Sequence, residues 1–306
     1  MTTTKLRIAS LIAAVILTSP AFAQENDFSA ATIETQEVAD GLYMLVLVGA
    51  GAGNIALSVG DDGAVIVDTQ FAPLNEKIRA AIRQAGGGDV KFVVNTHWHG
   101  DHAGGNEPFG NADAVIIAHN NVRTRMSTEQ VMTAFGAPQT IPPSPAAALP
   151  VLTFPNRATF HWNGNRVNVY HAPSAHTDGD SIIHFTDLNA FHMGDTFVNG
   201  GYPFIDNGSN GSINGIVTAA ESVLARSDEN TKIIPGHGPL ATPDDLRAFL
   251  NVVSTTRERI QTMIDQGRSL DDVIAAKPTA EWDATYGAGF MNGENFTRFA
   301  YQDLTE

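Results

Sequence analysis

One short stretch of the chain holds three histidines and one aspartate within six positions: His97, His99, Asp101 and His102. An apolar run over residues 91–95 precedes it and predicts a buried strand, and two glycines follow at 104–105. A strand or a helix would separate the four side chains, whereas a loop at a strand end lets all of them turn toward one centre. Imidazole nitrogen and carboxylate oxygen suit zinc and related ions. The alternative, a polar loop whose histidines only form hydrogen bonds, is disfavoured by four such groups in one loop.

A metal centre needs further ligands from distant parts of the chain, and three other strand ends each offer one. The candidates are His176, Asp195 and His237, which lie at the ends of predicted strands over 166–170, 190–193 and 232–234. Glycine or another small residue stands beside each of them, so the backbone can bend there toward a crevice. Functional side chains are commonly found at such strand ends in α/β folds.

The elements that must position these residues alternate between strands and helices. Apolar or alternating runs predict strands over residues 43–48, 54–59, 64–68, 91–95, 114–118, 159–162, 166–170, 181–185, 190–193 and 232–234. Amphipathic or capped segments predict helices over residues 73–85, 212–224, 242–267, 269 onward and 292–304. This order predicts an α/β fold in a single domain over residues 24–306.

Two segments carry no clear pattern of helix or strand. The polar residues up to about Asp40 predict a loose lead-in, and the Pro/Ala-rich stretch from Gly136 to Pro155 predicts a surface loop. By contrast, Asn163-Gly164 between two alternating runs predicts a tight hairpin turn.

The pattern of residues 1–23 predicts that the protein is exported from the cytoplasm. Lys5 and Arg7 precede an apolar stretch over residues 8–17, and Ala21-Phe22-Ala23 offers a small-residue cleavage site. Together these features predict a cleavable signal peptide over residues 1–23 and a periplasmic or secreted protein.

The chain has no cysteine, and therefore neither disulfides nor thiolate ligands. Its net charge of −15, or −15 − 2 = −17 without Lys5 and Arg7, argues against nucleic acid and anionic membranes as partners. A small-molecule substrate is the expected partner.

In this order, the candidate ligands resemble the signature of the metallo-β-lactamase superfamily, over about residues 42–240. Asp68, at the end of its predicted strand, matches the first motif of the family. The resemblance implies an αββα sandwich with two zinc ions at one sheet edge and leaves residues 241–306 as C-terminal helices. The implied ligands of the first zinc are His97, His99 and His176. Those of the second are Asp101, His102 and His237, with Asp195 bridging the two ions.

These implied roles are chemically consistent. Two ions that share a water lower its pKa and present hydroxide as a nucleophile, while one of them polarises the substrate carbonyl. Asp101 is then the catalytic residue that orients the hydroxide and relays its proton, in addition to being a ligand. Asp68 is expected to support the metal loop from behind rather than to bind metal.

Departures from the family pattern decide the expected reaction. Asp195 stands where β-lactamases of the superfamily carry cysteine, and Val198 stands where they carry a lysine that holds the drug's carboxylate. An arginine could replace that lysine, from Arg123, Arg125 or Arg166. An aspartate bridge is typical of glyoxalase II-like thioesterases, lactonases and phosphodiesterases, whereas export favours β-lactams. We therefore expect a secreted dizinc hydrolase of cyclic amides or esters, with β-lactamase activity that the missing lysine weakens.

Other functions remain open at this point. Lactone or thioester hydrolysis is the first alternative, a mono-iron sulfur dioxygenase with the same ligands is the second, and a metal-binding protein without catalysis is the third. The remaining histidines are expected to be structural: His119, His161, His171, His184 and His192.

Overall fold

The structure is a computed structural model that describes residues 27–133 and 138–306. The predicted signal peptide over residues 1–23 lies outside these residues. No helix in the described part of the chain is long and apolar enough to cross a membrane.

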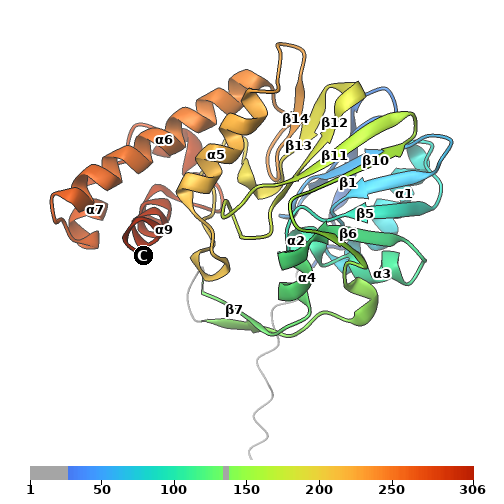
Figure 1. The fold of residues 1–306 in the computed structure, drawn as a ribbon, viewed down its shortest axis with the longest axis horizontal. Coiled ribbons are helices and arrows are strands. Elements are labelled where there is room, and N and C mark those ends of the chain that lie inside the picture. Colours follow the sequence, from blue (N-terminus) through green and yellow to red (C-terminus); the bar gives the residue numbers. More distant parts are fainter. Residues whose placement is uncertain (1–26, 134–137) are drawn as a thin grey trace, which may run out of the picture.

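Two β-sheets form the centre of the fold (Figure 1). The first sheet has the order β1-β2-β3-β4-β5-β6-β9, formed by Thr32–Ala39, Leu42–Val48, Ile55–Ser58, Ala64–Val67, Val90–Val94, Val115–His119 and Leu152–Phe154. The second has the order β10-β11-β12-β13-β14, formed by Arg157–Trp162, Asn165–His171, Ser181–Phe185, Ala190–His192 and Lys232–Ile234. A separate small hairpin joins β7 (Gln130–Met132) to β8 (Gln139–Ile141).

The two sheets pack against each other through one apolar layer. Val67 and Val94 of the first sheet share a buried cluster with Val169 and Ile183 of the second. The alternation of side chains along each strand sends every second residue into this layer. The strands of both sheets therefore end near one another, and the residues that follow them can meet.

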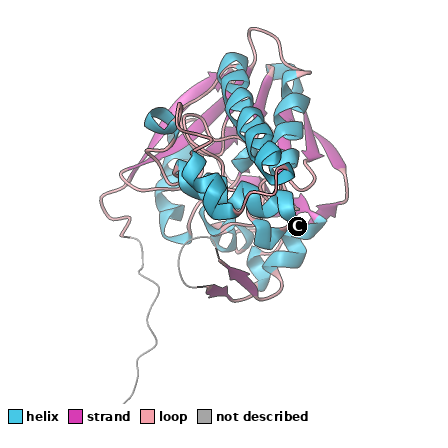
Figure 2. Ribbon diagram, turned by 90° about the vertical axis from the view of Figure 1, so that its left-hand side faces the viewer, coloured by secondary structure: helices cyan, strands magenta, loops and turns pink. Residues whose placement is uncertain are grey.

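Helices cover the outer faces of both sheets. Their bounds are α1 Asn75–Gln84, α2 Gly100–Ala103, α3 Asn106–Gly110, α4 Asn120–Met126, α5 Ile213–Leu224, α6 Pro243–Asp265, α7 Leu270–Ala276, α8 Asp283–Tyr286 and α9 Gly293–Thr305. Helix α1 packs Ile78 and Ile82 on the first sheet. Helices α5 and α6 pack on the second sheet, and in Figure 2 the C-terminal helices lie in front of the strands. The predicted αββα sandwich is confirmed.

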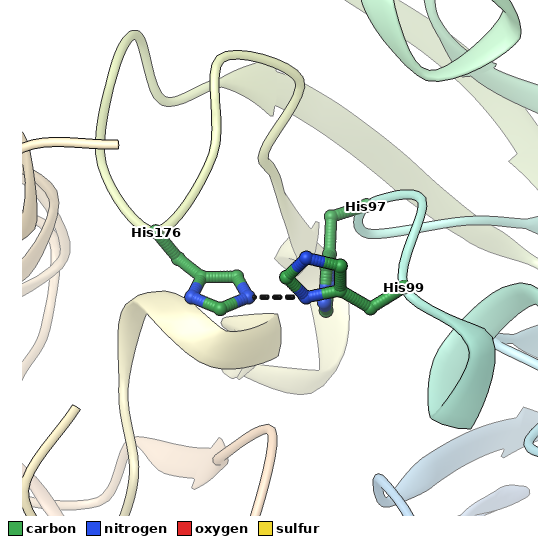
Figure 3. Close-up of side chains that lie close together, drawn as sticks. All are labelled: His97, His99 and His176. Atoms are coloured by element: carbon green, nitrogen blue, oxygen red, sulfur yellow. Dashed lines mark hydrogen bonds between the residues drawn. The ribbon is translucent and has the colours of Figure 1, made fainter. Parts of the chain in front are cut away.

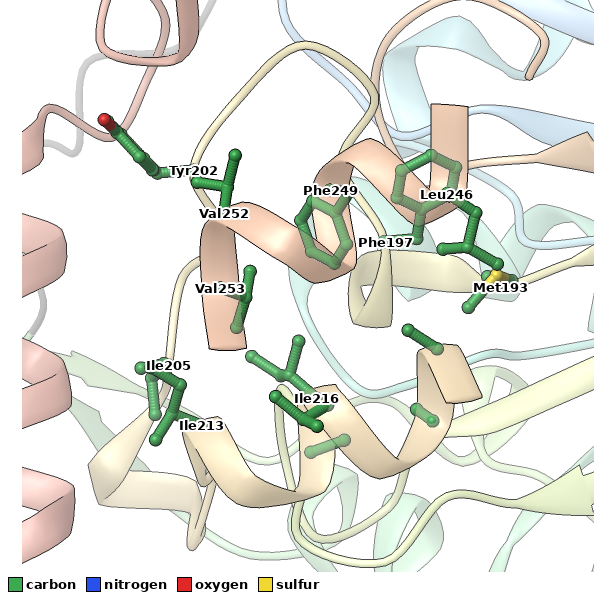
Figure 4. Packing of buried hydrophobic residues seen from close by; sticks show 14 of the residues in the cluster. Met193, Phe197, Tyr202, Ile205, Ile213, Ile216, Leu246, Phe249, Val252 and Val253 are labelled. Carbon is green, nitrogen blue, oxygen red and sulfur yellow. The ribbon is translucent and has the colours of Figure 1, made fainter. Parts of the chain in front are cut away.

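Large apolar side chains fill the space between α5, α6 and the end of β13. Met193 and Phe197 meet Leu246 and Phe249 from α6, as Figure 4 shows. Phe197 and Phe249 lie with their ring centroids 5.0 Å apart at 64°. Deleting a core phenyl ring of this kind typically costs about 3–5 kcal/mol of folding free energy. This cluster holds the turn that carries Asp195 firmly in place.

The fold also corrects two predictions. Residues 32–39 are not a loose lead-in but the strand β1, which pairs antiparallel with β2 at the edge of the first sheet. Most of its side chains are exposed, so its apolar signal is weak. The Pro/Ala-rich stretch, whose residues 136–137 lie outside the described part, is not a plain loop, because β8 and β9 lie within it.

The predicted hairpin turn is confirmed. Asn163 and Gly164 both have positive φ angles, of 49° and 73°, which is the conformation that asparagine and glycine tolerate best in a two-residue turn. The helix predicted from residue 242 is α6, and it begins with a reciprocal capping box between Thr242 and Asp245.

Candidate metal centre

The predicted site residues come together at one edge of the sandwich. His97 and His99 follow β5, His176 lies in the loop between β11 and β12, and Asp195 and His237 follow the parallel strands β13 and β14. In Figure 3, His97 and His99 reach in from one loop and His176 reaches toward them from the opposite side.

The first group consists of three buried imidazoles. His97, His99 and His176 place one ligand atom each within 4.8 Å of the others. Nε2 of His176 lies 2.8 Å from Nδ1 of His99 (Figure 3). Nε2 of His97 is buried and has no hydrogen-bond partner. A buried nitrogen with no partner is costly in a protein interior, and a metal ion among these three atoms would remove that cost.

The second group adjoins the first and is more open. Nε2 of His102 lies 3.3 Å from Nε2 of His237 and 3.6 Å from Oδ2 of Asp101, and that oxygen lies 3.2 Å from Nε2 of His237. The side chains of Asp101 and His237 are 29% and 32% exposed, whereas that of His102 is fully buried. Solvent and substrate therefore reach the site from the Asp101 and His237 side.

The carboxylate of Asp195 lies between the two groups. Its Oδ1 is 3.0 Å from Nε2 of His102, and its Oδ2 is 3.4 Å from Nε2 of His237 and 3.8 Å from Nε2 of His176. His97, His102 and Asp195 also form a compact set of three ligand atoms. This position is the one that a bridging carboxylate requires.

The far nitrogen of each buried imidazole is held by a hydrogen bond. His99 Nε2 pairs with Asp206 Oδ2 at 2.9 Å, and His176 Nδ1 donates to the carbonyl of Phe204 at 2.7 Å. His102 Nδ1 pairs with Asp68 Oδ2 at 2.7 Å. These partners fix the tautomers, so the unprotonated nitrogens face the centre, as is usual for histidines that bind metal.

Asp68 organises the loop that follows β5. Besides His102, its carboxylate accepts the backbone N–H and the hydroxyl of Thr96, at 2.8 and 2.7 Å. The Thr96 oxygen lies 3.0 Å from Nδ1 of His97, so a chain of bonds runs from Asp68 to both groups. Asp68 itself is fully buried and has a φ of 68°, which is rare for a residue other than glycine. It contacts the Nδ1 side of the His102 ring, away from the Nε2 atom that faces His237.

The predicted metal loop is only partly a loop. Residues 97–99 are irregular, but Asp101 and His102 lie on α2, a single helical turn. The sequence expectation that a helix would separate the ligands is wrong over this short span, because one turn presents both side chains before the chain leaves the site.

Two glycines allow the backbone to approach the ligands closely. A Cβ atom on Gly53 would lie 2.2 Å from the His102 ring, and one on Gly236 would lie 2.0 Å from Oδ1 of Asp195. Both distances are far below van der Waals contact. Neither position has room for a side chain while the ligand stays in place.

The electrostatics of the two groups differ. Burial, together with His102 and His176, holds the pKa of His97 well below its usual value, and burial and the neighbouring His99 lower the pKa of His176 to about 4. Burial opposes protonation of His237 as well, but Asp195 and Asp101 outweigh it and raise its pKa to about 10. Despite burial, His102 and His237 together lower the pKa of Asp101 to about 2. His97 and His176 are therefore neutral near pH 7, and the carboxylates of Asp101 and Asp195 are ionised, which are the states in which these groups bind a metal ion.

The donor set fits divalent metal ions. Five imidazoles and two carboxylates converge, the buried imidazoles have their outer nitrogens held, and one inner nitrogen has no other partner.

Sequence reasoning missed two residues that shape the site. Asp206 holds His99, and its backbone N–H donates to the His176 carbonyl at 3.0 Å. The side chain of Asn54 donates to the carbonyls of Pro235 and Gly238, at 3.0 and 2.9 Å, and so fixes the loop that carries His237. Neither lies at a recognisable spacing from the ligands, so no local signal in the sequence marks them.

Three of the remaining histidines and two of the arginines have other partners. His192 binds the backbone of Asn54, and His119 stacks on His171 with centroids 3.7 Å apart. Arg125 pairs with both oxygens of Asp178, at 2.8 and 2.7 Å, and Arg123 donates to the carbonyl of Pro150. Neither arginine therefore replaces the missing lysine in this structure.

Asp206→Asn tests the support of His99. We expect the affinity of the first group for metal to fall by about 10–100-fold, because a neutral amide accepts the imidazole N–H more weakly than a carboxylate does, and its NH2 group can hold the other tautomer instead. Competition with a chromogenic zinc chelator measures this affinity. Asp89→Asn, which changes an exposed carboxylate, is the control and should leave affinity unchanged. Equal affinities in both variants would show that Asp206 does not orient His99.

Comparison with known proteins agrees with this geometry. Residues 48–237 match the family model of the metallo-beta-lactamase superfamily. A hydroxyacylglutathione hydrolase from Nitrosococcus oceani is 28% identical over 166 residues, which are 54% of this chain and 55% of the relative. The chain thus spans about half the length of the curated relatives it matches.

Solved structures show the same fold. A metallo-beta-lactamase from Pontibacter korlensis has 18% identity and a TM-score of 0.58, covering 73% of this chain and 99% of that one. The inverting sec-alkylsulfatase Pisa1 from Pseudomonas sp. has 15% identity and a TM-score of 0.65, covering 88% of this chain and 50% of that one.

Proposed function

The chain belongs to the metallo-β-lactamase superfamily and is a metal-dependent hydrolase, and from this premise we propose that it uses two zinc ions to cleave ester, thioester or cyclic amide bonds. The observation that carries the proposal is the carboxylate of Asp195, within 3.0–3.8 Å of imidazoles from both groups. A single-ion site would not need a shared ligand at this position.

We assign the ligands as two sets that share one residue. His97, His99 and His176 would hold the first ion. Asp101, His102 and His237 would hold the second, and Asp195 would contribute to both sites. Bound in this way, two divalent ions would acidify a shared water and polarise the bond to be cut.

The chain's own groups supply the rest of the chemistry. Asp101 is ionised and partly exposed at the open side of the site, so it can orient the attacking water and accept its proton. Asp68 and Asp206 hold the buried imidazoles and keep their geometry through the reaction. The buried first group excludes solvent from one side, which strengthens electrostatic interactions there.

Ester-type substrates are favoured over β-lactams. Val198 pairs its backbone with that of His237 and offers no charge for a drug's carboxylate. Arg125 and Arg123 are engaged elsewhere. The relative from Nitrosococcus oceani is named as a hydroxyacylglutathione hydrolase, which supports an acyl ester or thioester as the substrate bond. We propose that β-lactam opening is slow by comparison. Export through residues 1–23 is part of the proposal and rests on the sequence pattern alone.

A substrate panel tests the reaction class. Zinc-loaded protein should hydrolyse thioesters and lactones with kcat/KM at least about tenfold above that for a chromogenic cephalosporin, since a missing charged contact typically costs more than 1 kcal/mol. Thiol release is measured with Ellman's reagent, which reads without background because the chain has no cysteine. A higher kcat/KM for the cephalosporin than for the thioesters and lactones would show that the main activity is that of a β-lactamase. Inactivity on every bond would refute the proposal.

A further inference from the structure

A cavity of about 240 Å³ lies between the outer face of the second sheet and helix α5. The buried part of its lining is apolar and includes Ile182, Phe191 and Val223. Its lining contains none of the proposed metal ligands and no aspartate or glutamate. We call this cavity the α5 pocket. It is therefore a hollow apart from the metal centre, with an apolar interior and no negative charge in its lining.

Two exposed arginines in the lining of the α5 pocket have no acidic partner. The guanidinium of Arg157 makes no hydrogen bond or ion pair with any residue that the structure describes. Arg226 donates to the carbonyl of Ser222 and lies over the Tyr170 ring, 5.4 Å from its centroid. The side-chain amide of Asn156 and the Tyr170 hydroxyl also line the pocket and have no hydrogen-bond partner within residues 27–133 and 138–306. Several donors are thus available to a ligand.

His184 lies beside the α5 pocket in a positive environment. Its ring stacks on that of Phe191, with the centroids 3.9 Å apart and the planes at 13°. Burial, followed by the charges of Arg226 and Arg166, lowers the pKa of His184 to about 4, although Asp187 acts in the opposite direction. This histidine is therefore neutral near pH 7. An anion bound near Arg226 would offset part of the positive charge and raise the pKa of His184.

We propose that the α5 pocket binds a small organic carboxylate with an apolar body, whose carboxylate is held by Arg157 and Arg226. A guanidinium presents its N–H groups in a planar arrangement that matches a carboxylate, and such charge-assisted hydrogen bonds are the strong ones. The apolar body gains by leaving water for the buried lining. Ligand sites in proteins combine an apolar lining with a few polar groups in this way. The proposal concerns a second site and goes beyond the proposed hydrolase function.

Calorimetric binding of a matched pair of compounds to the zinc-loaded protein tests the proposal. The pair is 3-phenylpropanoate and 3-phenylpropanamide, which share their apolar body and differ in charge. We expect the wild type to bind the acid at least about tenfold more tightly than the amide. Arg157→Gln and Arg226→Gln should each weaken binding of the acid by about tenfold or more, because each removes a charged donor.

Two further variants separate binding from folding and from general charge effects. Arg83→Gln removes an exposed guanidinium from α1, on the first sheet, and should leave the Kd of the acid unchanged. Arg226→Lys keeps the charge but not the planar group, and its Kd should lie between those of the wild type and Arg226→Gln. Because Arg157 and Arg226 are exposed, all these variants should keep the melting temperature of the wild type.

A second measurement locates the bound acid. The pKa of His184, followed by the NMR signal of its ring and assigned with His184→Gln, should rise when the acid saturates the wild type. It should stay unchanged when the acid is added to Arg226→Gln at the same concentration. An unchanged pKa in the wild type at saturation would show that the acid binds away from the α5 pocket.

The remaining outcomes each overturn the proposal. Equal Kd values for the wild type, Arg157→Gln and Arg226→Gln would place the acid elsewhere, for example at the metal centre. Equal binding of the acid and the amide would exclude recognition of the carboxylate. Inorganic phosphate that competes with the acid at equal affinity would show that the apolar body contributes nothing. None of these measurements uses turnover, so failure of the proposed hydrolase function and failure of this inference are distinguished.

Discussion

Asp195→Ala should lower kcat/KM by well over about 100-fold and leave the protein with fewer than two tightly bound metal ions. Even a residue that only orients a ligand is worth about 10–100-fold in metal affinity or activity, and Asp195 approaches both groups of ligands directly. Its carboxylate also supplies negative charge beside His102 and His237, where a bound cation needs it. The loss is expected to be the largest of any single substitution in the protein.

Metal analysis and turnover on the same sample measure this effect. Asp89→Ala removes an exposed carboxylate and is the matched control, expected to keep full metal content and rate. If Asp195→Ala retained two ions and most of its activity, the carboxylate would not be shared between the groups. The division into two adjoining sites would then be wrong.

Asp101→Asn should lower kcat by about 10²–10⁴-fold, the range that a positioned general acid–base group contributes. The amide keeps the shape of the side chain but has no proton acceptor of comparable basicity. Because Asp101 is 29% exposed and lies on the single turn α2, the substitution should leave the fold intact. Circular dichroism and the melting temperature check this.

The result of this substitution also separates catalysis from mere metal binding. A variant that keeps its zinc and its stability but loses turnover identifies Asp101 as part of the reaction. Unchanged turnover would show that Asp101 takes no part in proton transfer. Asp62→Asn, in an exposed turn remote from the ligands in sequence, serves as the control.

Much of the architecture follows from the sequence because the apolar runs coincide with buried strands. Strands β12 and β13 are almost wholly buried, β5 buries three of its five residues, and most of the buried side chains in these strands are apolar. Strand β1 could not be predicted in this way, because most of its side chains are exposed. It is an edge strand that is held by backbone pairing with β2 rather than by apolar burial. The pairing partner, and not the local sequence, decides its structure.

The ligands of the site are visible in the sequence, but their supports are not. Histidine and aspartate at strand ends are recognisable because few other roles need them there. Asp206 and Asn54 act through contacts more than 100 residues away along the chain, with His99 and with the Pro235 and Gly238 carbonyls. Only the folded chain brings these pairs together. Likewise, Arg157 and Arg226 line one cavity although they lie far apart in the sequence.

The most direct test is metal quantification by mass spectrometry on the protein as isolated and after reconstitution, with turnover measured on each sample. We predict two zinc ions per chain, with thioesterase or lactonase activity that rises with the second equivalent and disappears on chelation. One iron per chain, accompanied by oxygen consumption and no hydrolysis, would contradict the dinuclear hydrolase and indicate an oxidoreductase on the same fold.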